Sequence, residues 1–217
     1  MAKLQVTWTE LASYRVTTGG NAADVQDLST AQGMLNKADL QFERPLLVYL
    51  TSSHENEQQA QNVVESTTLK DERVSIASKF FTMVRDDGDQ ITKDHPYYKW
   101  IGGQDLPRFV VFTADGDKVG KIEGRASPSK LYDLMKKAIT KDYVVNLDRT
   151  IKDYQKILTS LDRLSVLKSA LSSKEGRTKS KSEQSKIERE KEALAKEEEE
   201  LRAREEDLLK IKKRDTA

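Results

Sequence analysis

Short apolar runs in the first two thirds of the chain have the pattern of strands. Residues 4–9 alternate apolar and polar positions, as in a half-buried strand, whereas 46–50 and 109–112 are almost continuously apolar, as in strands covered on both faces. Strands are predicted at 4–9, 46–50, within 74–84, at 109–112 and at 118–123. The segment 114–117 predicts a hairpin turn between the last two.

Apolar stripes with helical spacing lie between these runs. Helices are predicted over 29–42, from the possible caps Ser52 and Ser53 to about residue 69, over 93–100, and from Ser127-Pro128 to 138. The predicted order is β, α, β, α, β, α, β, β, α. This order indicates an α/β fold, a mixed sheet with helices on both faces and right-handed crossovers early in the chain.

After Tyr143 the apolar positions recur in steps of three and four, which is typical of helices that associate. A first amphipathic helix is expected to weaken at 172–177, and a second, highly charged helix is predicted over 182–213. In the second helix one apolar residue recurs every seven positions from Ile187, and the companion positions are Glu190, Glu197 and Arg204. The predicted assembly residues are Leu147, Ile151, Tyr154, Leu158, Leu161, Leu194, Leu201 and Leu208.

The leucine face of the first tail helix needs a covering surface. The candidates for that surface are the second helix in an antiparallel hairpin, the α/β domain, and another copy of the chain. If the second helix does not fold back, the two tail helices form an extended rod. We therefore expect three parts: a domain at 1–140 with its core at 29–139, an amphipathic helix at 141–173, and a highly charged helix at 174–217.

Composition narrows the possible functions. The 217 residues include 37 Lys and Arg and 36 Asp and Glu, a net charge of +1, which gives no support to nucleic-acid binding. The chain has no cysteine, so it has neither disulfides, thiolate nucleophiles nor cysteine-ligated metals. No apolar stretch is long enough to span a membrane and Met1–Leu4 does not resemble a leader, so a cytoplasmic protein is expected, although a secreted chain with its leader removed would read the same.

Several segments together resemble the thioredoxin family over about 29–139. Residues 44–52 are similar to the central strand that leads to the family's active-site helix, and Leu106-Pro107 to its cis-proline element. The turn at 114–116 and Gly124 match in order and spacing. The resemblance implies a thioredoxin-like fold, a cis bond at Pro107, and a peptide-docking edge formed by Leu106, Pro107, Gly124 and the 53–55 loop. The alternative is that the proline only maintains the shape of the fold.

The resemblance fails where the family has its two cysteines. This loop contains Ser53, His54, Glu55, Asn56, Glu57 and Gln58, and Glu55 and Gln58 align with the cysteine positions. The family's reaction needs a thiolate at the helix start and a second thiol to release it. Carboxylate and amide side chains perform neither step, so a redox-inactive member is expected.

No other motif predicts catalysis, a cofactor or a metal site. His54 and His95 are the two histidines, too few for a metal site without convergent carboxylates. Residues 86–89 lack the ligand spacing of a calcium loop and indicate a turn.

We therefore expect a non-enzymatic adaptor or structural protein that acts through protein–protein interaction and assembly of its helices. The alternatives are a thiol-independent, chaperone-like peptide binder that uses the cis-proline groove and, ranked last, an enzyme using His54 and Glu55.

Overall fold

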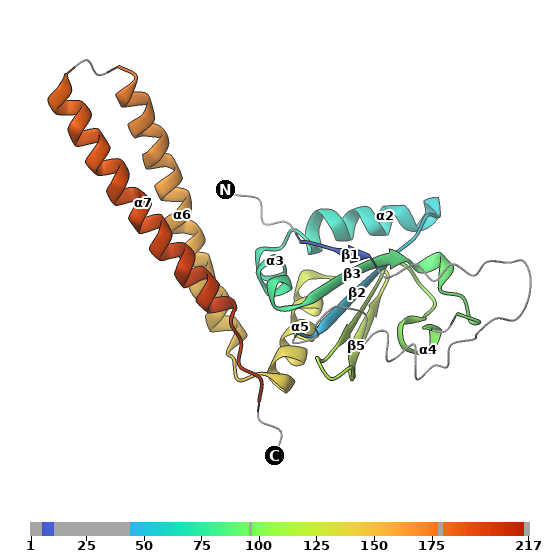
Figure 1. Ribbon diagram of the computed structural model, residues 1–217. Helices are drawn as coiled ribbons and strands as arrows, with labels where there is room; N and C mark the ends of the chain where they lie inside the picture. The colour runs from blue at the N-terminus through green and yellow to red at the C-terminus, as the bar shows by residue number, and fades with distance from the viewer. Residues whose placement is uncertain (1–5, 11–43, 96, 178–179, 215–217) are drawn as a thin grey trace, which may run out of the picture. The chain divides into compact units, whose positions relative to one another are not determined.

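The computed structural model describes residues 6–10, 44–95, 97–177 and 180–214. The chain forms two compact units (Figure 1). One is an α/β domain of residues 4–147 to which 212–217 also belong, and the other is a helical hairpin of residues 148–211. The α/β unit thus extends to residue 147, and the described residues 212–214 belong to it as well.

The α/β domain is built on a mixed five-stranded sheet. Its strands are β1 (Thr9–Glu10), β2 (Leu46–Thr51), β3 (Thr82–Asp87), β4 (Arg108–Phe112) and β5 (Lys118–Glu123). The spatial order is β1-β3-β2-β4-β5; β3 is parallel to β1 and β2, and β4 is antiparallel to β2 and β5. This topology confirms the predicted α/β, thioredoxin-like mixed sheet.

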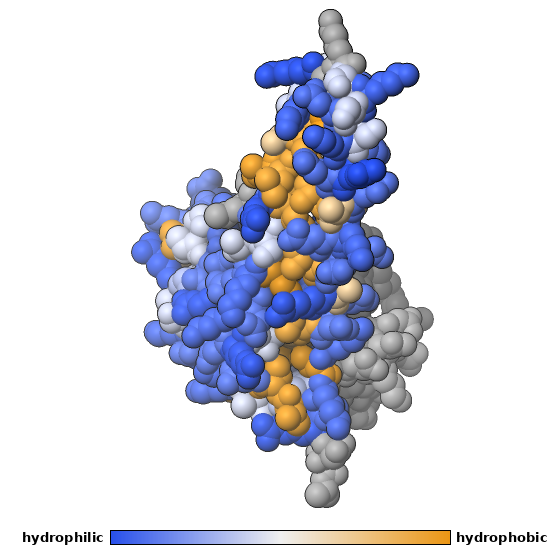
Figure 2. All heavy atoms as spheres, turned by 90° about the vertical axis from the view of Figure 1, so that its left-hand side faces the viewer, coloured by the Kyte–Doolittle hydropathy of each residue, from blue (hydrophilic) through white to orange (hydrophobic). Residues whose placement is uncertain are grey.

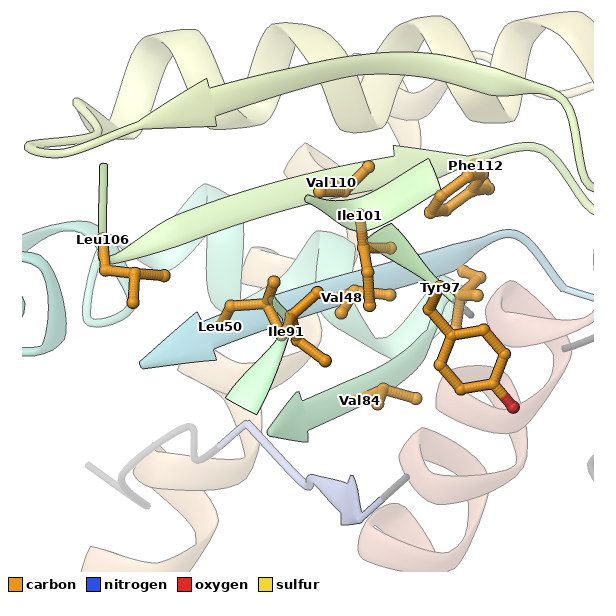
Figure 3. Close-up of a cluster of buried hydrophobic side chains, with 10 residues drawn as sticks. Val48, Leu50, Val84, Ile91, Tyr97, Ile101, Leu106, Val110 and Phe112 are labelled. Carbon is orange, nitrogen blue, oxygen red and sulfur yellow. The ribbon is translucent and has the colours of Figure 1, made fainter. Parts of the chain in front are cut away.

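Apolar side chains of the central strands alternate between two cores. Leu46, Val48 and Leu50 pack in one cluster with Ile91 and Ile101 on one face of the sheet (Figure 3). The intervening Leu47 and Tyr49 point to the other face, as strand geometry requires. Burial on both faces explains the continuous apolar run that predicted β2.

The helices of the domain are α2 (Glu55–Val63), continued by a π-helical turn (Val64–Thr68), α3 (Glu72–Ala77), α4 (Tyr98–Ile101) and α5 (Pro128–Asp142), with short 3₁₀ turns at Ser78–Phe80 and Gly88–Gln90. Helix α5 begins as predicted, because the Ser127 side chain accepts a hydrogen bond from the Lys130 N–H and Pro128 occupies the first turn.

Two predictions of local structure were wrong. The first half of 74–84 is helical, because Asp71 caps α3 by accepting from the N–H groups of Arg73 and Val74, and the strand starts only at Thr82. The helix predicted over 93–100 is confined to Tyr98–Ile101. The helix predicted over 29–42 and the first two residues of the strand predicted over 4–9 lie outside the described residues. Residues 6–8 form no strand, and β1 is confined to Thr9–Glu10.

The hairpin unit consists of α6 (Leu147–Glu175) and α7 (Lys181–Leu209), which run antiparallel (Figure 1). Three polar contacts join them along their length: Glu175 with Lys191, Lys168 with Glu198, and Tyr154 with Glu205. The tail therefore forms a hairpin, not a rod. None of the helices in the described residues combines the length and apolar character that a membrane crossing needs.

The companion positions predicted for α7 were wrong by one residue. Lys191, Glu198 and Glu205 are half-buried and reach α6, whereas Glu190, Glu197 and Arg204 are exposed. A residue three or four positions after an apolar residue lies near the same helix face, so the spacing alone allowed either choice.

The chain leaves α7 at Leu209, earlier than predicted, and its end joins the domain. The Val144 N–H donates to the Lys212 carbonyl at 3.0 Å, and the Arg214 N–H donates to the Asp142 carbonyl at 2.8 Å. The Lys213 ammonium pairs with Asp115 at 2.7 Å. Residues 212–214 therefore form a short antiparallel strap along the residues that follow α5.

Candidate functional site

The cis-proline loop and the loop that precedes α2 lie at the same end of the sheet. Leu50 in β2 is paired with Arg108 in β4, so 51–53 and 106–107 are the next residues on two adjacent, antiparallel strands. The Leu106–Pro107 peptide bond is cis. The residues that the family resemblance singled out thus come together at one end of β2 and β4.

Asp89 holds the loop before α2. Its carboxylate accepts hydrogen bonds from the Ser53 N–H at 2.8 Å, the Ser53 hydroxyl at 2.9 Å and the Ser52 hydroxyl at 3.1 Å. The Ser52 hydroxyl oxygen in turn accepts the His54 N–H at 3.0 Å. The two serines therefore bind Asp89 and do not cap α2, whose N-cap is His54 and has no side-chain cap bond.

The ionised form of Asp89 is favoured by these contacts. Burial has the largest single effect and raises the pKa of this carboxyl, but the hydrogen bonds from Ser53 and Ser52 together outweigh burial, and nearby His54 acts in the same direction. The pKa of Asp89 therefore lies below its usual value. Asp89 is a fixed negative charge that anchors the loop near neutral pH.

The arrangement of serine, histidine and aspartate is not that of a nucleophilic triad. His54 Nε2 lies 3.6 Å from Asp89 Oδ1, but both serine hydroxyls bind Asp89 and neither binds the imidazole. A triad needs the hydroxyl on the histidine so that the imidazole takes its proton. Among the described residues there is also no cluster of histidine and carboxylate groups that would hold a metal ion.

The residues aligned with the family's cysteines are on the surface. Glu55 opens α2 and is exposed, as are Asn56 and Gln58. The Gln58 amide donates to the Ser53 carbonyl at 3.3 Å, which closes the loop onto the first turn of the helix. Glu57 is half-buried, and its Oε2 atom has no hydrogen-bond partner among the described residues.

Leu106 points into the core rather than out of the loop. It is 8% exposed and belongs to the cluster that contains Leu50, Ile91 and Ile101 (Figure 3). Gly88 makes room for it, since a Cβ there would lie 2.4 Å from Leu106 Cδ2. Gly88 and Asp89, two consecutive residues after β3, therefore position the cis-proline loop and the helix-start loop.

A buried arginine fixes the segment that leads into the cis-proline loop. Arg108 pairs with Glu123 at 3.2 Å and donates to the carbonyls of Ile101 at 3.0 Å and Asp105 at 3.1 Å. The Gln104 N–H donates to the same Glu123 oxygen at 2.9 Å. This cluster satisfies the buried guanidinium and restrains residues 101–105, which precede Leu106.

Part of the predicted docking edge remains open. The Gly124 N–H donates to the Pro107 carbonyl at 2.9 Å, and Gly124 has a φ of 68°, a conformation that glycine adopts without strain. Within the described residues, the N–H and carbonyl of Leu106 make no hydrogen bond.

Sequence reasoning missed Asp89, Arg108 and Glu123. The acidic run at 86–89 was interpreted as a turn, and it does form one, in which the Asp87 side chain accepts from the Asp89 N–H at 3.0 Å. The role of Asp89 depends on a loop 36 residues away, and that of Arg108 on a strand 15 residues away. A charged residue next to an apolar strand was the available signal for Arg108.

The predicted assembly residues lie on α6 and α7 with graded burial. Leu147, Ile151 and Tyr154 are buried, whereas Leu158, Leu161, Leu194, Leu201 and Leu208 are half-buried. Two large apolar side chains of α6 remain exposed, Val166 at 69% and Leu167 at 38%.

Comparison with known proteins adds a distant structural likeness. No family model matches the chain. The search of curated proteins finds no match either. Among solved structures, the chain is similar to a thioredoxin from Thermus thermophilus, with 17% sequence identity, a TM-score of 0.38, and coverage of 52% of this chain and 84% of the thioredoxin.

Proposed function

We propose that this chain is a non-catalytic protein that acts through protein–protein interaction. Its α/β domain is a docking module and its helical hairpin is an assembly element. The observation that carries the proposal is the loop before α2. In a chain without cysteine, this loop exposes Glu55 and Gln58 where the family has thiols, and hydrogen bonds to Asp89 hold it in place. What such a site contributes is shape and surface.

The hairpin supports the assembly role. Val166 and Leu167 are exposed on α6, and the leucines at 194 and 201 are half-buried on α7. Figure 2 shows hydrophobic side chains in a stripe with hydrophilic side chains on both sides. Apolar surface of this kind on an otherwise highly charged hairpin favours a protein partner.

Co-purification of two differently tagged copies of the full chain tests this function. We expect each tagged copy to retain the other, and a Val166→Gln/Leu167→Gln variant to retain less, because both side chains are exposed. Val63→Gln is the matched control, since Val63 is 38% exposed but lies on α2. Equal retention by all three proteins, or none by the wild type, would contradict the assembly role.

A second candidate function is peptide binding at the cis-proline loop without thiols. The unpaired backbone groups of Leu106 favour it, because an extended peptide adds to such groups as a strand. Titration of the full chain with an unfolded polypeptide, followed by amide NMR, tests this function. Shifts confined to Leu106, Gly124 and residues 53–55 are expected if the groove binds, and unchanged resonances there would reject it.

A further inference from the structure

Strand β5 forms an edge of the sheet (Figure 1). Within the described residues it pairs with β4 on one side and with no strand on the other. The register shifts between Val111 and Phe112 of β4, whereas residues 120–123 of β5 pair regularly with β4. The regular stretch of β5 therefore has one row of main-chain groups that no neighbouring strand of the described chain covers.

The hydrogen-bond pattern shows which main-chain groups face this open side. Residues on antiparallel strands alternate between pairs that are joined by hydrogen bonds and pairs that are not. The Gly124 N–H bonds the Pro107 carbonyl, so the adjacent pair of Arg108 and Glu123 is not joined, and Lys121 follows Glu123 in the alternation. The N–H and carbonyl groups of Lys121 and Glu123 therefore point away from β4, and no hydrogen bond within the described residues reaches them.

Exposed lysines border this edge on the face of the sheet that α4 covers. Lys118 and Lys121 are exposed, and the Lys118 ammonium donates to the Trp100 carbonyl at 2.7 Å. Lys121 lies 3.2 Å from Glu123, but the same carboxylate also pairs with buried Arg108 at 3.2 Å. In this group a single carboxylate thus faces three cations, and Lys118 takes part in no ion pair within the described residues.

The titration of Lys118 reflects the excess of positive charge. Burial lowers the pKa of Lys118 most, and the charges of Lys121 and Arg108 lower it further, whereas Glu123 opposes them. An additional carboxylate at this place would therefore be attracted by the group as a whole.

Further lysines lie on the other face of the sheet. Leu134 of α5 packs against β5, since a Cβ on Gly120 would lie 2.9 Å from Leu134 Cδ2. Lys130 and Lys137, four positions before and three after Leu134, share its side of the helix and are exposed. Asp133 is the single acid between residues 128 and 137. The open edge of β5 is thus bordered mainly by lysine on both faces.

These charges decide which strand suits the edge. Lysine on an edge strand hinders pairing with an identical strand, because like charges then lie opposite one another. A second copy of β5 is therefore a poor occupant. An acidic strand would place carboxylates opposite Lys118 and Lys121, and opposite charges on paired strands are stabilising.

We propose that β5 binds an extended, acidic segment of another protein, which adds to the sheet beside β5 as a further strand. This inference rests on the proposed function and names the partner chemistry of the α/β docking module. Main-chain hydrogen bonds to Lys121 and Glu123 hold the segment, and the lysines at 118 and 121 select its acidic side chains.

Titration of the isotope-labelled full chain with a synthetic peptide tests the inference. The probe is a peptide of about ten residues that alternates valine and glutamate and has blocked ends, because valine favours strands. We expect amide NMR shifts confined to 118–123 and largest at Lys121 and Glu123. A peptide that alternates valine and lysine should leave these resonances unchanged. Equal shifts with both peptides would overturn the selection by charge.

Charge-reversed variants test the lysines themselves. Lys118→Glu/Lys121→Glu should raise the dissociation constant of the acidic peptide roughly tenfold. The milder Lys118→Gln/Lys121→Gln should raise it less, and amide spectra outside β5 should stay unchanged in both. Lys70→Glu/Lys93→Glu changes the net charge as much as the first variant, at exposed residues elsewhere in the domain, and should bind as the wild type does. Equal weakening in this control overturns the inference.

A peptide without main-chain donors separates strand addition from attraction by charge alone. The same acidic peptide with N-methylated main-chain amides keeps its carboxylates but cannot donate to the Lys121 and Glu123 carbonyls. We expect it not to bind. Binding equal to that of the unmethylated peptide would show that no strand is added and would overturn the inference.

The position of the shifts distinguishes this inference from the proposed function. Shifts at 53–55 and Leu106, with none in β5, would assign the peptide to the cis-proline loop and overturn the inference. Absence of any shift in a chain whose copies still retain one another overturns the inference and leaves the assembly role standing. Shifts in β5 of a chain that does not self-associate support the inference and contradict the assembly role alone.

Discussion

Asp89 accepts two hydrogen bonds from Ser53, one from the backbone N–H at 2.8 Å and one from the hydroxyl at 2.9 Å. This relationship joins the turn after β3 to the loop before α2. The loop is therefore ordered by a carboxylate and two hydroxyls. The order of the loop therefore does not depend on cysteine, which the chain lacks.

Replacing Asp89 with asparagine should loosen this loop. One carboxylate oxygen and the negative charge are lost, and the Ser53 N–H or a serine hydroxyl loses a strong acceptor. We expect Asp89→Asn to lower the free energy of unfolding by about 1–3 kcal/mol, measured with urea. Asp94→Asn, at an exposed position, should change it by less than about 0.5 kcal/mol. Equal effects of the two substitutions would contradict the anchoring role.

The contribution of Asp89 should disappear in acid. Its pKa in the folded domain lies below the value of about 3.9 expected for the unfolded chain. Ionised Asp89 therefore contributes stability that is full above about pH 4 and is lost as the pH falls through the folded pKa. The difference in unfolding free energy between wild type and Asp89→Asn should be constant from about pH 7 to 5 and shrink below about pH 4. A difference that grows in acid would show the opposite shift.

Buried Asp142 should not disturb that comparison. Burial raises the pKa of Asp142, which opposes the effect of Asp89, but the residue is present in both proteins. Its contribution therefore cancels when the two unfolding free energies are subtracted at each pH.

Arg108 should contribute far more to the free energy of unfolding than Lys121, the other cation that contacts Glu123. The Arg108 side chain is 3% exposed, and its loss leaves the carbonyls of Ile101 and Asp105 without their donor. We expect Arg108→Met to destabilise the domain by about 2–5 kcal/mol. Lys121→Met removes a 3.2 Å contact to the same carboxylate from an exposed side chain, and should cost less than about 1 kcal/mol. Chemical denaturation of both variants compares their losses in free energy of unfolding. A smaller loss for Arg108→Met than for Lys121→Met would refute the prediction.

Gly88 should tolerate no side chain while Leu106 keeps its position. An alanine Cβ would lie 2.4 Å from Leu106 Cδ2 and 3.1 Å from Leu50 Cβ, so Gly88→Ala should cost about 1–3 kcal/mol. In the double variant with Leu106→Ala the total loss should be smaller than the sum of the two. Gly176→Ala is the control, because its nearest atom would be 3.9 Å away. Additive losses at 88 and 106 would show that the two residues do not compete for space.

The ion pair of Lys168 and Glu198 should help to hold α6 against α7. Lys168→Glu places two acids together and should increase amide hydrogen exchange in both helices, whereas the double reversal with Glu198→Lys should restore protection. Lys152→Glu is the comparison, because Lys152 is exposed on the same helix and takes part in no ion pair within the described residues. Exchange that rises equally in the single and double reversals would exclude a role for this pair.

The sequence predicted most of the central sheet, because β2 and β4 are buried on both faces and their apolar runs have no other good interpretation. It failed at 74–80, where the apolar spacing suits a strand or a helix and the deciding contact is the cap at Asp71. The site shows the same division. The positions of Ser53 and Pro107 followed from local motifs, whereas Asp89 and Arg108 act through partners far along the chain, which no local pattern identifies.

The helical tail shows the same contrast between positions that a local pattern predicts and positions that a distant partner decides. The leucines with heptad spacing on α7 are half-buried, but the choice between Glu197 and Glu198 depended on where Lys168 lies on the other helix. Polar residues within an apolar seam are specified by their partners, and the partner becomes known only when the hairpin is formed.

The molecular mass of the full chain in solution tests the central claim most directly. Light scattering over a concentration series should give a mass well above the 24.6 kDa of one chain at the upper end. The Val166→Gln/Leu167→Gln variant should shift toward 24.6 kDa at the same concentration. A wild-type mass of 24.6 kDa at every concentration would contradict an assembly role for the hairpin.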